Sequence, residues 1–412
     1  MSATPHMHLG AHFPGVNNTT VWSDPRSGSH IEFDSFVKFA RTAERAKFDF
    51  LFLAEGLRLR EQSGQIYDLD VVGRPDTFTV LAGLAAVTDR LGLAGTINST
   101  FNEPYEVARQ FMLTAWELFD SWGTDEIRAD KDSGTFLETG RPGLFEHHDD
   151  YFDIGGCFNV PRSPQGRPVI FQAGDSDEGR DFAAETADAI FSRHGSLEAG
   201  QAFYRDVKGR MARFGRTPEQ LVVLPATTFA LADTDSEARE LAHSVREQQV
   251  SGQTAIKLLE QLWNRDLSAH DPDGPLPQID PLLGENTIAR GRASVRMYKD
   301  PLATAAEWRQ RAEAKSLSIR QLIIEVTGRQ SFVGSPETIA LTMEKFVKEG
   351  ASDGFILVPH ITPGGLDEFA DRVIPILQER GSFRADYEGE TLRDHLGVGA
   401  STTRGRFART GS

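Results

Sequence analysis

The segment Ala173-Gly-Asp-Ser176 carries residue types that are suited to binding an anion. Gly174 permits a tight turn, and Asp175 and Ser176 are residue types that cap the N-terminus of a helix. Such a turn directs free backbone N–H groups and the positive end of the helix dipole toward one point, and Ser176 adds a hydroxyl donor. We therefore predict a phosphate-binding turn. From these residues alone an ordinary capped turn without a ligand stays open, because glycine turns often follow strands.

The residues on either side of this turn predict the elements that hold it. Val169 to Phe171 form a short apolar run after Pro168, which is typical of a strand buried on both faces of a parallel sheet. The residues from Gly179 to Asp188 predict the helix that follows the turn. The order of strand, glycine turn and helix start places the predicted anion site at the C-terminal end of a strand.

Apolar runs and helical patterns alternate along most of the chain, which predicts an α/β fold whose parallel strands are joined by right-handed crossovers. Seven core strands are predicted, at residues 9–13, 48–53, 91–97, 169–172, 189–191, 221–231 and 353–359. A closed (β/α)8 barrel needs eight strands. The gap falls between residues 100 and 169, where residues 104–122 predict one helix and residues 123–166 predict a surface excursion rich in turn residues.

Composition narrows the classes of function. The 412 residues carry a formal net charge of −16, which argues against a nucleic-acid partner. Cys157 is the one cysteine, so an intrachain disulfide and a zinc cluster of cysteines are excluded. No apolar run is long enough to span a membrane and the N-terminus has no signal-peptide pattern, so we expect a cytoplasmic protein.

Histidines near predicted strand ends are further candidates. His12, His194 and His360 each lie at or just after such an end, where the ring could contact a cofactor or substrate, or could be a hydrogen-bonded structural histidine. The segment Glu146-His-His-Asp-Asp150 looks like a metal cluster, but adjacent residues of an extended segment point to opposite faces. We therefore predict a solvated loop there and no metal site.

Several segments, taken in order, resemble the bacterial-luciferase superfamily of flavin-dependent monooxygenases. Within that superfamily the chain is similar to the branch that contains nitrilotriacetate monooxygenase, dibenzothiophene-sulfone monooxygenase and pristinamycin synthase. The matching segments are residues 12–15, 52–55, 102–111, 158–168, 171–176 and 331–336. Their order and spacing, more than any single motif, make the resemblance specific up to about residue 397.

The resemblance implies a TIM-type barrel that binds FMN at the C-terminal ends of its strands. It also implies that a separate NAD(P)H:flavin reductase supplies reduced FMN, that O2 is the oxidant, that a small organic molecule is oxidised and that the protein is a homodimer. The cofactor-binding positions that the resemblance and the turn together assign are Glu55, Ser99, Thr100, Ala173, Gly174, Asp175 and Ser176. No catalytic residue is assigned.

The chain departs from this family at one place. Relatives have a segment of roughly fifty residues after the match that ends at Phe111, and that segment contains the fourth barrel strand; here Phe111 runs directly into the end of a helix. We therefore expect one incomplete barrel domain over residues 1–397, with a helical insertion at about 250–330 and a disordered tail at 398–412. Two alternatives are a catalytically impaired flavin-binding remnant and an F420-type oxidoreductase.

Overall fold

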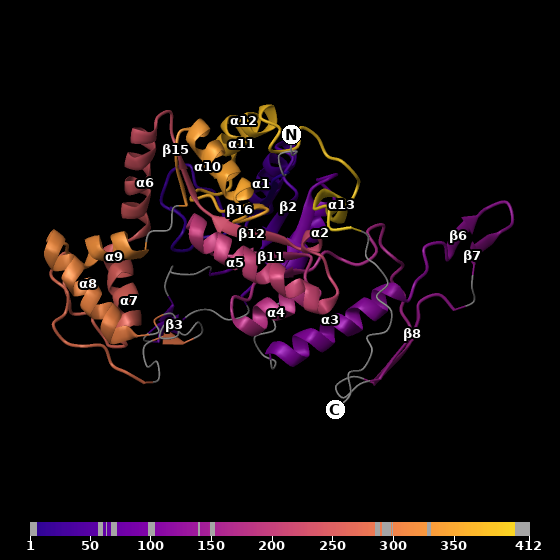
Figure 1. Ribbon diagram of the computed structural model, residues 1–412, viewed down its shortest axis with the longest axis horizontal. Coiled ribbons are helices and arrows are strands. Elements are labelled where there is room, and N and C mark those ends of the chain that lie inside the picture. Colours follow the sequence, from indigo (N-terminus) through magenta and orange to yellow (C-terminus); the bar gives the residue numbers. More distant parts are fainter. Residues whose placement is uncertain are drawn as a thin grey trace. The chain divides into compact units, whose positions relative to one another are not determined.

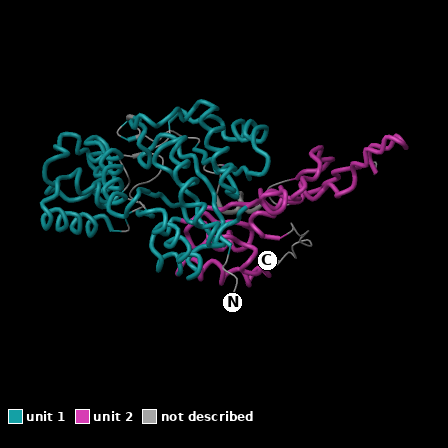
Figure 2. Tube along the Cα trace, turned by 90° about the horizontal axis from the view of Figure 1, so that it is seen from above, with its two compact units in different colours: residues 1–96, 193–201, 225–385 teal, residues 97–192, 202–224, 386–412 magenta. Residues whose placement is uncertain are grey.

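A computed structural model shows how the chain folds (Figure 1). The residues that it describes are 6–56, 61–62, 64–66, 72–97, 104–138, 141–148, 153–284, 289–290, 298, 300–327 and 331–399. The chain forms two compact units, which Figure 2 colours separately. Unit 1 contains residues 1–96, 193–201 and 225–385, and unit 2 contains residues 97–192, 202–224 and 386–412.

A curled sheet of seven strands confirms the predicted fold class and strand number. The strands are β1 (His8–His12), β2 (Phe50–Leu53), β5 (Gly92–Gly95), β10 (Phe171–Gln172), β11 (Ala189–Ser192), β12 (Val222–Thr227) and β16 (Gly354–Leu357). Their order is β10-β11-β12-β16-β1-β2-β5, and the recorded pairs are parallel. This is the circular order of an eight-stranded barrel without its fourth strand, and β5 and β10 end the sheet.

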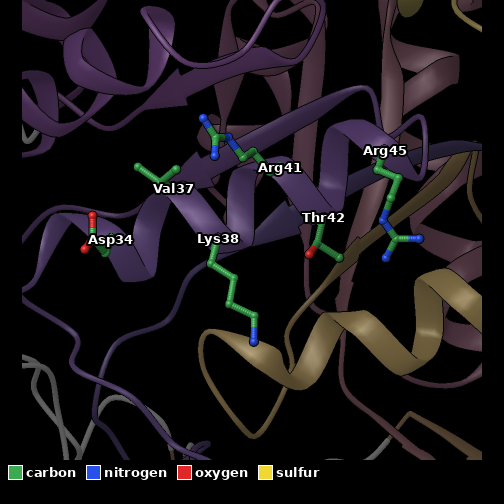
Figure 3. Close-up of a pocket in the computed structure, with 6 residues that line it drawn as sticks. All are labelled: Asp34, Val37, Lys38, Arg41, Thr42 and Arg45. Carbon is green, nitrogen blue, oxygen red and sulfur yellow. The ribbon is translucent and has the colours of Figure 1, made fainter.

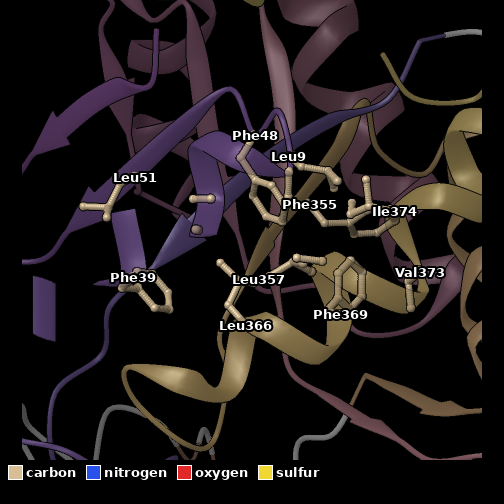
Figure 4. Close-up of a cluster of buried hydrophobic side chains, with 14 of the residues drawn as sticks. Leu9, Phe39, Phe48, Leu51, Phe355, Leu357, Leu366, Phe369, Val373 and Ile374 are labelled. Carbon is tan, nitrogen blue, oxygen red and sulfur yellow. The ribbon is translucent and has the colours of Figure 1, made fainter. Parts of the chain in front are cut away.

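Helices of unit 1 cover one face of its strands and enclose a hydrophobic core (Figure 4). They are α1 (Phe33–Arg45), α2 (Thr77–Ala85), α10 (Pro336–Lys348), α11 (Asp367–Arg372) and α12 (Ile374–Glu379). Side chains alternate along a strand, so Leu9 of β1 enters this core while Gly10 and His12 lie on the opposite face. On that face the ring of Phe50 occupies the space beside Gly10, which has no side chain.

Asp49 forms a buried ionic cluster at the start of β2. Its carboxylate is fully buried and accepts hydrogen bonds from the backbone N–H of Leu9 at 2.7 Å and from Arg384 Nη2 at 2.5 Å, and it lies 3.1 Å from His8 Nδ1. Burial alone would raise the pKa of Asp49, but His8 and Arg384 outweigh it and hold the pKa below its usual value. The cluster joins β1, β2 and the segment after α12.

The insertion after β12 is mostly helical. A parallel pair, β13 (Phe229–Leu231) and β15 (Phe332–Gly334), frames α6 (Asp235–Gln249), α7 (Gly252–Trp263), α8 (Pro301–Lys315) and α9 (Ile319–Thr327). The last three helices share a core of their own. The strands β3 (Glu61–Gln62), β4 (Gln65–Ile66) and β14 (Ala289–Arg290) form a small antiparallel sheet. Gln62 attaches this sheet to α7, because its Nε2 donates to Glu260 Oε2 at 2.7 Å.

Unit 2 contains the predicted surface excursion. The helix α3 (Pro104–Asp120) leads into two antiparallel hairpins, β6 (Ile127–Asp130) with β7 (Thr135–Leu137) and β8 (Leu144–His148) with β9 (Asp153–Cys157). Among the described residues 104–165 there is no strand of the main sheet. The helices α4 (Asp177–Thr186) and α5 (Leu197–Arg210) follow β10 and β11. Short helices in the described part of unit 2 include η1 (Met211–Phe214), η2 (Pro218–Gln220) and α13 (Leu392–His395), and unit 1 contains η4 (Gly364–Leu366).

Predicted core strands differ from the observed strands in extent. The strand predicted at 169–172 begins only at Phe171, and the backbone N–H of Ile170 bonds the side chain of Asp188. The strand predicted at 221–231 divides into β12 and β13, which pair with different strands. The segment from Gly364 to Glu379 forms η4, α11 and α12 in place of one continuous helix, and Pro375 lies in the first turn of α12. None of the described helices is long and apolar enough to cross a membrane.

Candidate cofactor site

The turn between β10 and α4 has the geometry of an anion site. Ser176 is the N-cap of α4, and its Oγ accepts a hydrogen bond from the backbone N–H of Gly179 at 3.1 Å. Within the described part of the chain, the backbone N–H groups of Gly174, Ser176, Asp177 and Glu178 have no hydrogen-bond partner in the protein. Four N–H donors at the positive end of a helix could bind a phosphate, and phosphate binding by this segment stays a prediction.

Two glycines let the turn lie directly on the first turn of α4. A Cβ atom on Gly174 would lie 3.1 Å from Gly179 Cα, and a Cβ atom on Gly179 would lie 3.0 Å from Gly174 Cα and C. Real side chains rarely tolerate such contacts with backbone, so both positions require glycine or a shift of the turn. The close approach keeps the donors together, and these residues fit the phosphate of a nucleotide-like cofactor.

Arginines offset the carboxylates around the turn. Arg180 donates to Asp175 Oδ1 at 3.1 Å and to the backbone oxygen of Asp175 at 3.2 Å, and it also bonds Asp206 of α5 at 2.8 Å. Arg210 of α5 bonds Asp177 Oδ1 at 2.9 Å. Hydrogen bonding to carboxylates raises the pKa of both guanidinium groups. The two arginines hold α4 on α5 and reduce the repulsion that a bound phosphate would meet.

In unit 1 the parallel register brings two candidates to the same edge of the sheet. β1 ends at His12, which pairs with Phe52, and Glu55 follows the end of β2 two residues later. His12 Nδ1 lies 3.1 Å from the carbonyl oxygen of Phe52, so Nδ1 carries the proton and donates it in a hydrogen bond. In the neutral ring Nε2 is then an acceptor. Arg74 donates to the backbone oxygen of Ala54, beside Glu55.

The predicted cofactor-binding residues do not all belong to the same compact unit. Ala173, Gly174, Asp175 and Ser176 form one turn of unit 2, and Glu55 belongs to unit 1. Ser99 and Thr100 lie outside the described residues. Whether Glu55, Ser99 and Thr100 share one site with the turn therefore stays a prediction.

His12 makes stability depend on pH. The pKa of His12 is lowered to about 4, mainly by burial; the hydrogen bond to Phe52 opposes this shift, and the charge of Arg74 adds to it. An unfolded histidine titrates near 6.5, so between about pH 6.5 and 4 the unfolded chain binds more protons and folding weakens as pH falls. Over this pH range, the free energy of unfolding should fall by about 1–3 kcal/mol less in His12→Asn than in the native protein. Urea unfolding at a series of pH values measures it, and an unchanged slope would contradict it.

The remaining histidines have different surroundings. His360 follows β16, and its Nδ1 is buried without a partner among the described residues. Burial first, and then the charge of Arg26, lower the pKa of His360. His194 follows β11. The roles of His194 and His360 stay open between cofactor contact and structure.

The histidine segment of the excursion has structural partners. His147 Nδ1 lies 2.8 Å from Glu117 Oε2, and its Nε2 lies 3.3 Å from Thr114 Oγ1, which fixes β8 on α3. His148 Nδ1 lies 2.5 Å from Asp153 Oδ1. Asp149 and Asp150 are outside the described residues. In the part of the chain that the structure describes, no group of three or more His, Cys, Asp and Glu side chains could hold a metal ion.

A separate hollow of about 470 Å³ lies along the outer face of α1 (Figure 3). Its lining residues are Asp34, Val37, Lys38, Arg41, Thr42 and Arg45. Lys38 and Thr42 contact Asp367 of α11 at 3.4 and 2.6 Å, and Arg45 contacts Asp371 at 2.6 Å. These pairs join α1 to α11, so the hollow belongs to the packing of these two helices.

The strand order defines a barrel-type α/β protein, in which a glycine turn and the N-terminus of α4 follow the C-terminal end of β10. The sequence matches the profile of the family described as Luciferase-like monooxygenase over residues 11–120 and 137–353, and the chain belongs to this family. The resemblance drawn from the sequence, including its branch, is confirmed.

Two curated relatives match nearly the whole chain. N-acetyl-S-(2-succino)cysteine monooxygenase of Bacillus subtilis (strain 168) is 33% identical, with 96% of this chain and 98% of the relative covered. Nitrilotriacetate monooxygenase component A of Aminobacter aminovorans is 35% identical, with 97% and 98% covered. The solved structure of DmoA from Hyphomicrobium sulfonivorans has a TM-score of 0.73 at 24% identity, covers 98% of this chain and 93% of its own, and supports the fold.

The comparisons also bear on the missing strand. The alignment with the Bacillus subtilis relative has 449 positions but covers 96% of a chain of 412 residues, so about fifty of its positions have no residue of this chain opposite them. That length is sufficient for a strand and its crossover helix. It agrees with the absence of a fourth strand between β5 and β10 in the described sheet.

Proposed function

We propose that this protein is the oxygenating component of a two-component system. It would bind reduced FMN delivered by an NAD(P)H:flavin reductase and insert one oxygen atom from O2 into a small organic substrate. The proposal rests mainly on the backbone N–H groups that have no hydrogen-bond partner in the turn where Gly174 contacts Gly179. Family membership supports the reaction class, and a relative that is named component A supports a reductase partner. We also propose a homodimer.

The residues of this chain would have defined tasks. The N–H groups of Gly174, Ser176, Asp177 and Glu178 and the hydroxyl of Ser176 would bind the FMN phosphate, with Ala173 and Asp175 completing the turn. Glu55, Ser99 and Thr100 would contact the ribityl chain or the ring system. Bound reduced FMN supplies the reaction with O2, so the protein needs to orient the cofactor, position the substrate and exclude water.

The substrate class follows from two relatives. Their names identify nitrilotriacetate and N-acetyl-S-(2-succino)cysteine, and both molecules carry carboxylate groups. We propose that this chain also oxidises a small amine or sulfur compound. Dibenzothiophene sulfone, for which another relative is named, extends the panel of substrates to a neutral aromatic molecule.

Reductase-coupled oxygen uptake tests the proposal. We expect the purified protein to bind FMN in a fluorescence titration and, with a flavin reductase, NADH and FMN, to consume O2 in proportion to one of the three substrates. Catalase in a parallel reaction corrects for hydrogen peroxide that is formed without substrate oxidation. A folded protein that binds no FMN, in oxidised or reduced form, would contradict the proposal.

The absence of the fourth strand favours a second candidate, a flavin-binding protein with impaired catalysis. The same assay separates the two, because FMN binding without substrate-dependent O2 uptake would identify the impaired protein. An F420-type oxidoreductase would instead bind the deazaflavin, whose absorbance differs from that of FMN.

A further inference from the structure

Arg246 has a buried guanidinium edge without a partner. Nε and Nη2 of Arg246 are inaccessible to solvent and bond to no atom among the described residues. These two nitrogens carry the parallel N–H bonds with which arginine binds a carboxylate in two places at once. The chain uses this edge elsewhere, since Arg380 Nε and Nη2 bond the two oxygens of Glu344 at 2.8 and 2.9 Å. At Arg246 the corresponding carboxylate is missing.

The sequence places Arg246 in the last turn of α6. Thr234 and Glu237 form a capping box that starts the helix at Asp235, and Ala242 and Val245 are on its buried face next to Arg246. The far end is fixed as well, because Arg320 donates to the backbone oxygens of Glu247 and Val250 at 2.9 and 2.8 Å. Arg246 is therefore held on a rigid element.

Two contacts bring this end of α6 to the C-terminal edge of the unit 1 strands. Gln249 Nε2 donates to the backbone oxygen of Thr19, in the loop after β1, at 2.6 Å. α6 also packs against β13, which directly continues β12. After a short loop at the end of β13, α6 runs back along this strand. The last turn of α6 is therefore on the side of the sheet where His12 ends β1.

The carboxylate of Glu325 does not satisfy Arg246. Glu325 of α9 is the carboxylate whose charge acts on Arg246, but its Oε1 is bonded to Lys315 at 2.7 Å and lies 3.8 Å from Arg311. Burial lowers the pKa of Arg246, with Glu325 opposing that shift. Burial of two N–H groups that have no hydrogen-bond partner destabilises a fold. An arginine kept at such a position, in a chain of net charge −16, is explained by an anion that arrives from outside.

We propose that Arg246 binds a carboxylate group of the substrate through Nε and Nη2. The inference rests on the proposed function, because it identifies the substrate of that site as an organic acid. A bidentate pair of this kind fixes both the position and the orientation of the bound carboxylate. Arg246 is thus a binding residue that selects anionic over neutral substrates.

Calorimetric titration of the full-length protein with nitrilotriacetate in metal-free buffer tests the inference. We expect Arg246→Met to weaken binding by about 10- to 100-fold, because two charge-assisted hydrogen bonds are lost. Arg246→Lys, which keeps the charge without the parallel N–H pair, should bind with intermediate affinity. The exposed Arg239 on the same helix is the matched control, and Arg239→Met should leave the affinity unchanged.

Thermal unfolding separates a binding role from a structural one. Because Arg246→Met removes two buried N–H groups that have no partner, its Tm should be equal to or above that of the native protein. A lower Tm together with unchanged nitrilotriacetate affinity would overturn the inference. So would a native protein that binds neither nitrilotriacetate nor succinate. FMN titration of the same samples distinguishes the two proposals. A native protein that binds no FMN would refute the flavin function, whereas the effect of Arg246→Met on nitrilotriacetate affinity would still test the carboxylate site.

Discussion

Replacing Gly179 with alanine is expected to weaken FMN binding by about 10- to 100-fold. The new Cβ atom would lie 3.0 Å from Gly174 Cα and C, so the backbone of the turn must move away from α4. Hydrogen bonds to charged groups contribute about 1.5–3 kcal/mol each, and tenfold in affinity is about 1.4 kcal/mol. Misplacing one or two N–H donors therefore accounts for the loss. Anaerobic titration with reduced FMN and aerobic titration with FMN both measure it.

Gly209 provides the matched control for this substitution. It lies in α5 of the same unit, and a Cβ atom built there meets nothing within 4 Å. Gly209→Ala should therefore stabilise the helix by about 0.5–1 kcal/mol and leave the affinity for FMN unchanged. If Gly179→Ala also binds FMN with native affinity, the phosphate does not sit on this turn and the proposed function loses its main support.

Local patterns in the sequence were sufficient to predict the strand number and the turn. Each core strand is a short apolar run, and the gap after residue 100 is visible because residues 104–120 have a helical pattern without an interruption. Ser176 was recognisable as a helix cap from its position after a glycine turn. A strand in the interior of a sheet and the start of a helix are determined within a few residues, so they can be read from one segment.

Features that join distant segments could not be predicted in this way. Arg384 bonds Asp49 across 335 positions of the chain, and no local pattern connects the two. The contact of Gly179 with Gly174 depends on how tightly the turn lies on the helix, although a second glycine five residues after the first was a usable signal. Arg246 was missed because an arginine on a helix is usually solvated, and its burial depends on packing within the insertion.

Without the fourth strand the sheet stays open and has two edge strands, and the short length of these strands limits association with other chains. An open parallel sheet leaves unpaired backbone groups on its two outer strands, which favours association with other chains. Here the outer strands are short, since β5 has four residues and β10 has two. Short edge strands are one of the ways in which proteins limit such association. The open sheet is therefore compatible with a stable folded protein, and this bears on the choice between the active and the impaired flavoprotein.

Asp49→Ala is expected to destabilise the protein by about 3–5 kcal/mol, which is typical of removing one partner from a buried ion pair. The substitution leaves Arg384 and the N–H of Leu9 buried without the carboxylate that they bond. Urea unfolding at pH 7 measures the change in the free energy of unfolding. The exposed Asp89 of the same unit is the control, and Asp89→Ala should change this free energy by less than about 0.5 kcal/mol.

The difference between the native protein and Asp49→Ala should also depend on pH in a defined direction. Because the pKa of Asp49 is lowered in the folded state, its contribution is fully present above the pKa of an unfolded aspartate, about 3.9, and is lost as pH falls through the lower folded value. The two unfolding free energies should therefore converge below about pH 4. A loss under 1 kcal/mol at pH 7 would contradict an ionised Asp49 and indicate that burial keeps its carboxyl group neutral.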